Sequence, residues 1–174
     1  FDIRKDVLYC DSKNSKKRKS SLVLLNVILD SLLKWFAPIL SFTAEEIYQL
    51  VSKNKKSIHL EKFIEFPKKF ENLKLDKKWS ELLKIRDICN LSIEEKRAQK
   101  EIGSSLEATL KISLNKKNKD IIQNIDFAEL CITSNSEISL TDQPDILVET
   151  SKASGNKCPV CWKISKNPCP RHSQ

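Results

Sequence analysis

The sequence is short of several residue types on which enzyme sites often depend. It contains no methionine and only two glycines, Gly103 and Gly155. A phosphate-binding loop needs several glycines close together, so these two exclude it. The two histidines, His59 and His172, are also far apart in the chain. We therefore expect no self-contained catalytic site, and the missing initiator methionine indicates a piece of a longer polypeptide.

Long apolar runs and a secretion signal are also missing. No run approaches the roughly 18 apolar residues of a membrane span, and the first residues, FDIRKDVLYC, lack the basic-then-apolar pattern of a signal peptide. Cys10, Cys89 and Cys131 are scattered, whereas the other three cysteines lie close to a histidine. Without a secretion signal this grouping favours a metal site over disulfides. We expect a cytoplasmic protein without membrane contact.

The charge balance is strongly basic. The 31 lysines and arginines exceed the 23 acidic residues and give a formal net charge of +8, which points to a polyanionic partner. The alternative is that an AT-rich genome places lysine wherever a solvated residue suffices. Distribution favours the first interpretation, because the segment from position 152 to the end has no acidic residue and five basic ones: Lys152, Lys157, Lys163, Lys166 and Arg171.

The first hundred residues have helical periodicity. Apolar residues recur at steps of three and four from Leu22 to Phe36, which predicts a helix that packs on others and ends near Pro38. Two capping boxes are expected, one at Thr43 and Glu46 and one at Ser92 and Glu95. Between them, residues 52–75 are interpreted as a surface connection with apolar anchors at Ile58, Leu60, Phe63 and Phe66. The pattern does not decide between one helix and two over 79–103, where Gly103 is a suitable stop.

The period then changes from helical to alternating. Residues 106–114, LEATLKISL, predict a half-buried strand. Residues 117–126 allow a short helix, and LCIT (130–133), EISL (137–140) and ILVE (146–149) predict three more strands. The fold class is α+β with segregated parts. We expect a helical domain over 1–103, a small α+β junction domain over 104–152 and a tail over 153–174.

The tail carries two pairs of metal-ligand residue types, CPVC and CPRH, separated by a seven-residue spacer. Zinc takes four thiolate or imidazole ligands in a tetrahedron, and a CxxC-type spacing lets one turn supply two of them. We predict one structural Zn²⁺ on Cys158, Cys161, Cys169 and His172, which leaves no open position for a water. Free thiols in an unstructured tail are the alternative. Trp162 either packs over this knuckle, the favoured role, or offers a stacking surface to an unpaired base.

Several of these motifs together resemble a known family. YCD at 9–11 and APILSFTAEEIY at 37–48 are similar to the anticodon-binding helical domain of class I aminoacyl-tRNA synthetases. RxxKxIGxSLEA from Arg97, and KCPVCW in the tail, resemble the isoleucine enzymes in particular. Those enzymes usually end in two CxxC pairs with a longer spacer, so His172 and the compact spacer depart from their pattern.

The resemblance implies the C-terminal part of a ligase that joins isoleucine to tRNA-Ile with ATP. The catalytic signatures of that family, HIGH and KMSKS, have no counterpart here, because the histidines are wrongly spaced and methionine is absent. No catalytic residue and no ATP site are therefore expected in this chain. It would bind the anticodon stem-loop, pack against the rest of the synthetase polypeptide and act within a monomer.

The expected RNA contacts are basic and aromatic residues, because phosphates attract lysine and arginine and splayed bases stack on rings. The candidates are Lys16, Lys17, Arg18, Lys19, Arg97, Lys100, Trp162, Lys163 and Arg171. Each could instead be an ordinary solvated residue, and Arg97 could pair with Glu94 or Glu101. Two other functions stay open from the sequence: a free-standing zinc-ribbon adaptor, and a purely structural domain.

Overall fold

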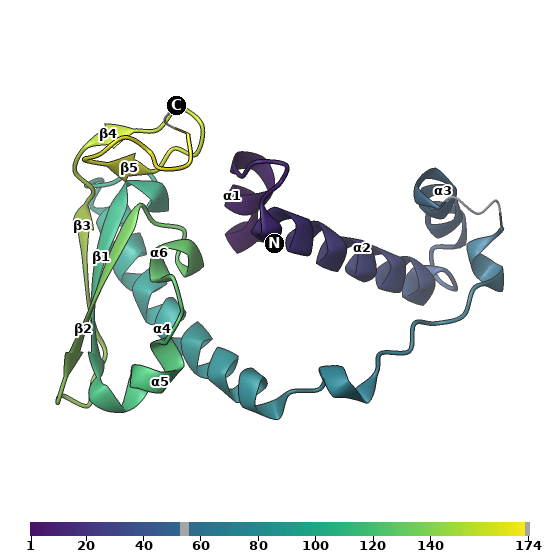
Figure 1. The fold of residues 1–174 in the computed structure, drawn as a ribbon, viewed down its shortest axis with the longest axis horizontal. Helices are drawn as coiled ribbons and strands as arrows, with labels where there is room; N and C mark the ends of the chain where they lie inside the picture. Colours follow the sequence, from purple (N-terminus) through teal and green to yellow (C-terminus); the bar gives the residue numbers. More distant parts are fainter. Residues whose placement is uncertain (53–55, 173–174) are drawn as a thin grey trace. The chain divides into compact units, whose positions relative to one another are not determined.

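The computed structural model describes residues 1–52 and 56–172 and shows an α+β protein (Figure 1). The chain divides into two compact units. One contains Phe1–Asp6 together with Asn72–Gln174, and the other contains Val7–Glu71. Helix α1 (Asp2–Cys10) begins in the first unit and ends in the second. Among the described residues, no helix is long and apolar enough to cross a membrane.

The Val7–Glu71 unit is built from two helices and a short turn. Helix α2 (Lys16–Phe36) begins at Ser15, whose side chain accepts a hydrogen bond from the Arg18 backbone N–H. Helix α3 (Ser41–Val51) and the 3₁₀ turn η1 (Ile58–Leu60) pack against it. A second 3₁₀ turn, η2, covers Lys68–Phe70. The core of this unit is small and consists of Leu33, Ala37, Ala44, Tyr48 and Ile58.

The structure corrects the expected details of this region. Helix α3 begins at Ser41 without a side-chain cap, so the predicted Thr43–Glu46 capping box is wrong. Glu45 connects α3 to η1 instead, because its Oε2 accepts hydrogen bonds from the Ile58 N–H and the Ser57 hydroxyl, both at 2.9 Å. Of the four predicted anchors, Ile58 alone is buried, whereas Leu60, Phe63 and Phe66 are exposed.

In the other unit, α4 (Leu73–Ala98) is one continuous helix. Its buried side chains Leu82, Ile85, Cys89 and Ile93 follow the helical period and form one face of the core. Ser92 lies inside this helix, so the second predicted capping box is wrong as well. The Ser92 hydroxyl instead lies 2.7 Å from the Thr150 hydroxyl of the sheet.

A three-stranded sheet lies against α4 (Figure 1). Strand β1 (Ala108–Asn115) is central, with β2 (Asn135–Thr141) parallel on one side and β3 (Leu147–Lys152) antiparallel on the other. The predicted alternation is confirmed, because every second residue of β1 is buried: Ala108, Leu110, Ile112 and Leu114. The 3₁₀ turn η3 (Ser105–Glu107) precedes β1.

A parallel pair needs a crossover, and the segment between β1 and β2 supplies it. It contains the 3₁₀ turn η4 (Lys116–Asn118) and the short helices α5 (Lys119–Ile122) and α6 (Phe127–Leu130). The strand predicted at 130–133 is therefore wrong: α6 ends there, and Ile132 turns the chain with a φ of 58°. Phe127 and Leu130 are buried in the same core as α4.

Candidate metal centre and nucleic-acid interface

The tail forms a small knuckle around two very short strands, β4 (Asn156–Lys157) and β5 (Ile164–Ser165), which pair antiparallel. Gly155 opens it with a φ of 127°. A Cβ at this position would lie 2.1 Å from the Ser165 carbonyl oxygen, so no other residue fits without a backbone shift. Backbone hydrogen bonds from Cys158 N–H to the Lys163 carbonyl and from Trp162 N–H to the Cys158 carbonyl, each 2.9 Å, close the first ligand turn.

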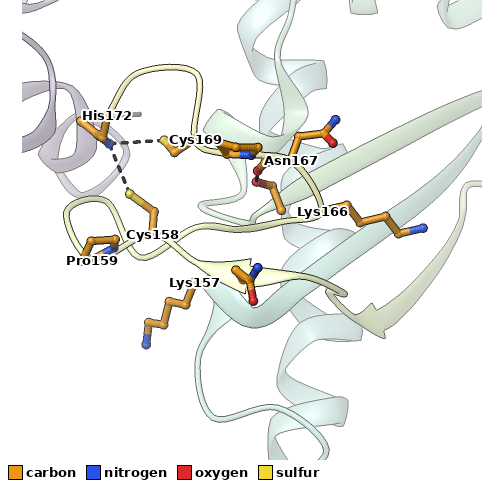
Figure 2. Close-up of a pocket in the computed structure, with 10 residues that line it drawn as sticks. Lys157, Cys158, Pro159, Lys166, Asn167, Cys169 and His172 are labelled. Atoms are coloured by element: carbon orange, nitrogen blue, oxygen red, sulfur yellow. Dashed lines mark hydrogen bonds between the residues drawn. The ribbon is translucent and has the colours of Figure 1, made fainter. Parts of the chain in front are cut away.

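The knuckle brings the four predicted ligand side chains together. Their ligand atoms all lie within 4.8 Å of one another, and Cys158 and Cys161 are buried. The His172 Nδ1 is 3.4 Å from the Cys158 Sγ and 3.3 Å from the Cys169 Sγ, as Figure 2 shows. The Cys161 and Cys169 sulfurs are 3.8 Å apart. The group can therefore hold a metal ion.

The three short distances, from 3.3 to 3.8 Å, are close to those of a tetrahedral site. With Zn–S near 2.3 Å and Zn–N near 2.0 Å, ligand atoms are separated by about 3.5–3.8 Å. Backbone hydrogen bonds from Cys161 and Val160, together with the His172 ring, lower the pKa of the Cys158 thiol to about 6. Burial raises the pKa of the Cys161 thiol, and a hydrogen bond from Arg171 opposes this effect. The donor set of three sulfurs and one imidazole suits zinc, and it is filled entirely by protein.

A small cavity of about 270 Å³ is lined by three of the four candidate ligands, Cys158, Cys169 and His172. Figure 2 shows that Lys157 and Pro159, on either side of Cys158, and Lys166 and Asn167 of the spacer also line it.

Ser134 attaches the knuckle to the sheet. Its hydroxyl donates a hydrogen bond to the Leu106 carbonyl and accepts one from the Ile164 N–H at 2.6 Å. A backbone hydrogen bond of 2.7 Å from Ala153 N–H to the Glu107 carbonyl lies just before the knuckle. The sheet thus fixes β5 through a side chain that precedes β2.

Arg171 lies in the loop between the ligands Cys169 and His172, and it points to α1. Its two terminal nitrogens donate to the two carboxylate oxygens of Asp6 at 2.9 and 2.8 Å. The Arg171 and Asp6 side chains are only 30% and 19% exposed. Two parallel hydrogen bonds of this kind form a strong and directional ion pair. The Arg171 guanidinium is therefore engaged within the protein.

Trp162 is more exposed than the sequence indicated. It is 59% exposed, so the favoured expectation that it packs over the knuckle is wrong. Its φ of 62° is costly for a bulky residue. The Lys157 ammonium lies 5.6 Å from the centroid of its ring, within the range of a cation–π contact. Lys163 is half-buried beside it.

The other candidates lie on helices. Lys16, Lys17 and Lys19 are exposed in the first turn of α2, and Arg18 there is half-buried. Arg97 forms an ion pair of 2.6 Å with Glu94, one of the two partners foreseen from the sequence. Lys100 is exposed just after α4 with a φ of 59°. The structure thus gathers the knuckle candidates in one place, brings Arg97 and Lys100 together at the end of α4, and leaves the four basic residues 16–19 on α2.

Residues 1–113 match the model of a family described as the anticodon-binding domain of tRNA ligase. Because this match covers more than half of the chain, the chain belongs to the family of anticodon-binding domains of tRNA ligases.

Relatives of this chain include several isoleucine–tRNA ligases. The chain is 64% identical over 173 residues to an isoleucine–tRNA ligase of Pelagibacter ubique, a match that covers 99% of this chain and 19% of the relative. It is 38% identical to the isoleucine–tRNA ligase of Rhodopseudomonas palustris, with 94% of the chain and 18% of the relative covered. It is 39% identical to the isoleucine–tRNA ligase of Bradyrhizobium diazoefficiens, with 95% of this chain and 18% of the relative covered. The chain thus spans about a fifth of the length of these relatives.

Three residues of the site escaped the sequence interpretation. Asp6 and Ser134 are ordinary polar residues without a motif, and their partners in the knuckle are 165 and 30 positions away in the sequence. Lys157 is part of KCPVCW but was not among the candidate contacts. Lys157 could have been found from its position directly before the first ligand. The other two carry no local signal.

Proposed function

We propose that this chain is the part of an isoleucine–tRNA ligase that binds the anticodon stem-loop of tRNA-Ile. The observation that carries the proposal is the 64% identity to such a ligase over almost the whole chain, together with the family match. In this proposal, the ATP-dependent attachment of isoleucine and the editing reaction belong to the rest of the polypeptide. This chain contributes neither catalytic residues nor an ATP site.

We further propose a cytoplasmic, monomeric ligase whose segment here has three functional parts. They are an anticodon-binding helical part over 1–103, a junction over 104–152 and a zinc knuckle over 153–174. Helix α4 belongs to the first part by sequence, although it packs on the sheet of the second. That packing supports a junction that carries helix α4 on its core and the knuckle through the hydrogen bonds of Ser134.

The metal is proposed to be one structural Zn²⁺ on Cys158, Cys161, Cys169 and His172. Their spacing in the structure and the lowered pKa of Cys158 support it, because zinc binds the thiolate and not the thiol. The His172 Nδ1, which faces the sulfurs, would be the fourth ligand atom. When bound, the metal supplies folding free energy to a segment that has almost no core of its own.

RNA contacts are proposed on three surfaces. Lys16, Lys17, Arg18 and Lys19 would contact phosphates, because they place four cations on the first turn of one helix. Trp162 would stack on an unpaired base, with Lys163 and Arg171 nearby, and its exposure supports this role. Arg97 and Lys100 are proposed as a further phosphate contact.

The test is binding of the chain to tRNA-Ile and to a control tRNA across a range of salt concentrations. Replacing Lys16, Lys17, Arg18 and Lys19 by glutamine should weaken binding and lower the magnitude of the salt slope by about 3, since each phosphate contact contributes roughly 0.7–0.9. Neutralising the exposed Lys116, Lys117 and Lys119 at the far end of β1 is the matched control. An unaltered slope in the first variant would exclude the α2 surface.

A second function is favoured by one observation. Many large apolar side chains of α2, α3 and the turn between them are exposed, among them Leu24, Trp35, Ile39, Phe42 and Leu50. Apolar exposure on this scale marks an interface, and we propose that the rest of the synthetase polypeptide covers it. The chain would then also stabilise the catalytic body. Tight, selective tRNA binding by the chain alone supports recognition, whereas no binding supports a scaffolding role.

A further inference from the structure

The first turns of α1 are attached to the sheet unit by three separate contacts. Ile3 packs against the apolar core of α4 and β1. The Arg4 Nη1 donates to the Glu129 Oε1 at 2.7 Å. Asp6 receives the two hydrogen bonds of Arg171. The third contact differs from the others, because its partner belongs to the metal knuckle and not to the core.

Arg171 cannot take its place in this contact independently of the ligands. It lies between Cys169 and His172 in sequence, and its side chain also hydrogen-bonds the Cys161 thiol. Its guanidinium therefore lies between the sulfur cluster and the Asp6 carboxylate. Three thiolates around a divalent cation leave a net charge of about −1, so one cation is shared by two anionic groups.

We propose that Asp6 and Arg171 form a clasp that couples metal binding in the knuckle to the docking of α1. The inference rests on the proposed metal site. A bound metal fixes the loop from Cys169 to His172 and so holds Arg171 where Asp6 can receive both hydrogen bonds. Without the metal, the loop is free, the bidentate pair loses its geometry, and α1 depends on its contacts through Ile3 and Arg4.

The coupling must act in both directions, because two linked binding equilibria change each other by the same factor. If metal favours the docked α1, then the docked α1 favours metal. Loss of the Asp6 carboxylate should therefore weaken metal binding, although Asp6 is not itself a ligand. Arg171 is in this sense a positioning residue for α1, and Asp6 is one for the metal loop.

The experiment measures Zn²⁺ affinity of the full chain by competition with a chromophoric chelator, with Asp6→Asn as the test variant. We expect about a tenfold loss of affinity, within the range usual for such couplings. The same samples are examined by hydrogen exchange with and without Zn²⁺. In the wild type, metal removal should lower the protection of amides 3–10 by about tenfold as well. In Asp6→Asn the loss of protection should be much smaller, because α1 is already released before the metal is removed.

Asp2→Asn is the matched control. It removes the same charge from the same helix, but Asp2 pairs with Lys5 of α1 and not with the knuckle. Asp6→Glu is the conservative variant, and it should restore the affinity to within about threefold. Helix content by circular dichroism shows whether Asp6→Asn is folded. If it is not, the protection of amides 3–10 in the wild type and in Asp2→Asn carries the test, because protection that does not change on metal removal would overturn the clasp.

The possible outcomes distinguish failure of the clasp from failure of the proposed metal site. Tight Zn²⁺ binding by the wild type with equal affinities for Asp6→Asn and Asp2→Asn would overturn the clasp and leave the metal site standing. No Zn²⁺ binding by the wild type would overturn both. Weaker binding in Asp6→Asn alone, with rescue by Asp6→Glu and metal-dependent protection of α1, supports the clasp.

Discussion

Removal of the proposed metal is the most direct test of the knuckle. The knuckle over residues 156–172 buries only two of its apolar side chains, those of the ligands Cys158 and Cys161. Its regular structure is limited to β4 and β5, with two residues each. Each buried side chain of this size contributes about 1 kcal/mol, whereas a structural zinc ion supplies on the order of 10 kcal/mol. The metal term is therefore several times larger than the apolar one.

We expect chelation to unfold the knuckle and to leave the sheet unit folded. The main core of that unit extends from Leu82 to Cys131 and includes no residue of the knuckle. The assay is a ¹H–¹⁵N correlation spectrum before and after addition of a strong chelator. Signals of residues 156–172 should collapse to unfolded positions, and those of β1 and β3 should stay in place. Added Zn²⁺ should restore the first set.

Single substitutions make the same test without a chelator. Cys169→Ala should abolish stoichiometric metal binding, whereas Cys10→Ala, which removes a thiol outside the four-ligand set, should retain it. An unchanged spectrum for residues 156–172 after complete metal removal would refute the reasoning. It would mean that Ser134 and the short strands stabilise the knuckle without help from a metal.

Two further predictions concern the backbone of the knuckle and the acid stability of the helical unit. Gly155→Ala should cost more than about 2 kcal/mol, because its Cβ would overlap the Ser165 carbonyl in a conformation that alanine rarely adopts, and a lowered thermal midpoint of metal release checks this. Hydrogen bonds from Gln49, from the Ile58 N–H and from Ser57 hold the pKa of Glu45 below its usual 4.5. The carboxylate therefore stabilises the α3–η1 contact above pH 4.5, and this stabilisation is lost as the pH falls through the lowered pKa. Thermal unfolding should show a steeper loss for the wild type than for Glu45→Gln between about pH 5 and pH 3, and parallel curves would contradict the assignment.

Local patterns in the sequence were sufficient for the elements that are stabilised locally. The alternation along β1 predicted its buried residues, because one face of a strand is set by a period of two. The same reasoning failed at 130–133, where a short apolar run fits either a strand or the end of a helix. There Phe127 and Leu130 enter the core from α6, and this tertiary packing decided the outcome.

In the helical unit, the sequence predicted the secondary structure but not which side chains are buried. The apolar periodicity of α2 correctly predicted a helix, but it did not predict burial, since Leu22, Leu32 and Phe36 are exposed and Leu33 is buried. Periodicity identifies the face that a helix offers to a partner, whether or not the partner belongs to the same segment of chain. In this chain the apolar face of α2 extends beyond what α3 and η1 cover, so burial could not follow from the local sequence.

The proposed metal site also has a part that the local sequence predicts and a part that it does not. Its four ligands lie between positions 158 and 172 and are brought together by turns that the sequence encodes directly. What orients the knuckle comes from elsewhere: Ser134 acts across 30 positions and Asp6 across 165. A ligand spacing can predict that four donor atoms meet, because coordination is a local geometric demand. It cannot predict which surface the metal loop faces, because that depends on contacts that exist only in the folded chain. The stacking surface of Trp162 and the clasp at Arg171 are both consequences of that orientation, so tests of the two proposals should be made on the folded, metal-loaded chain.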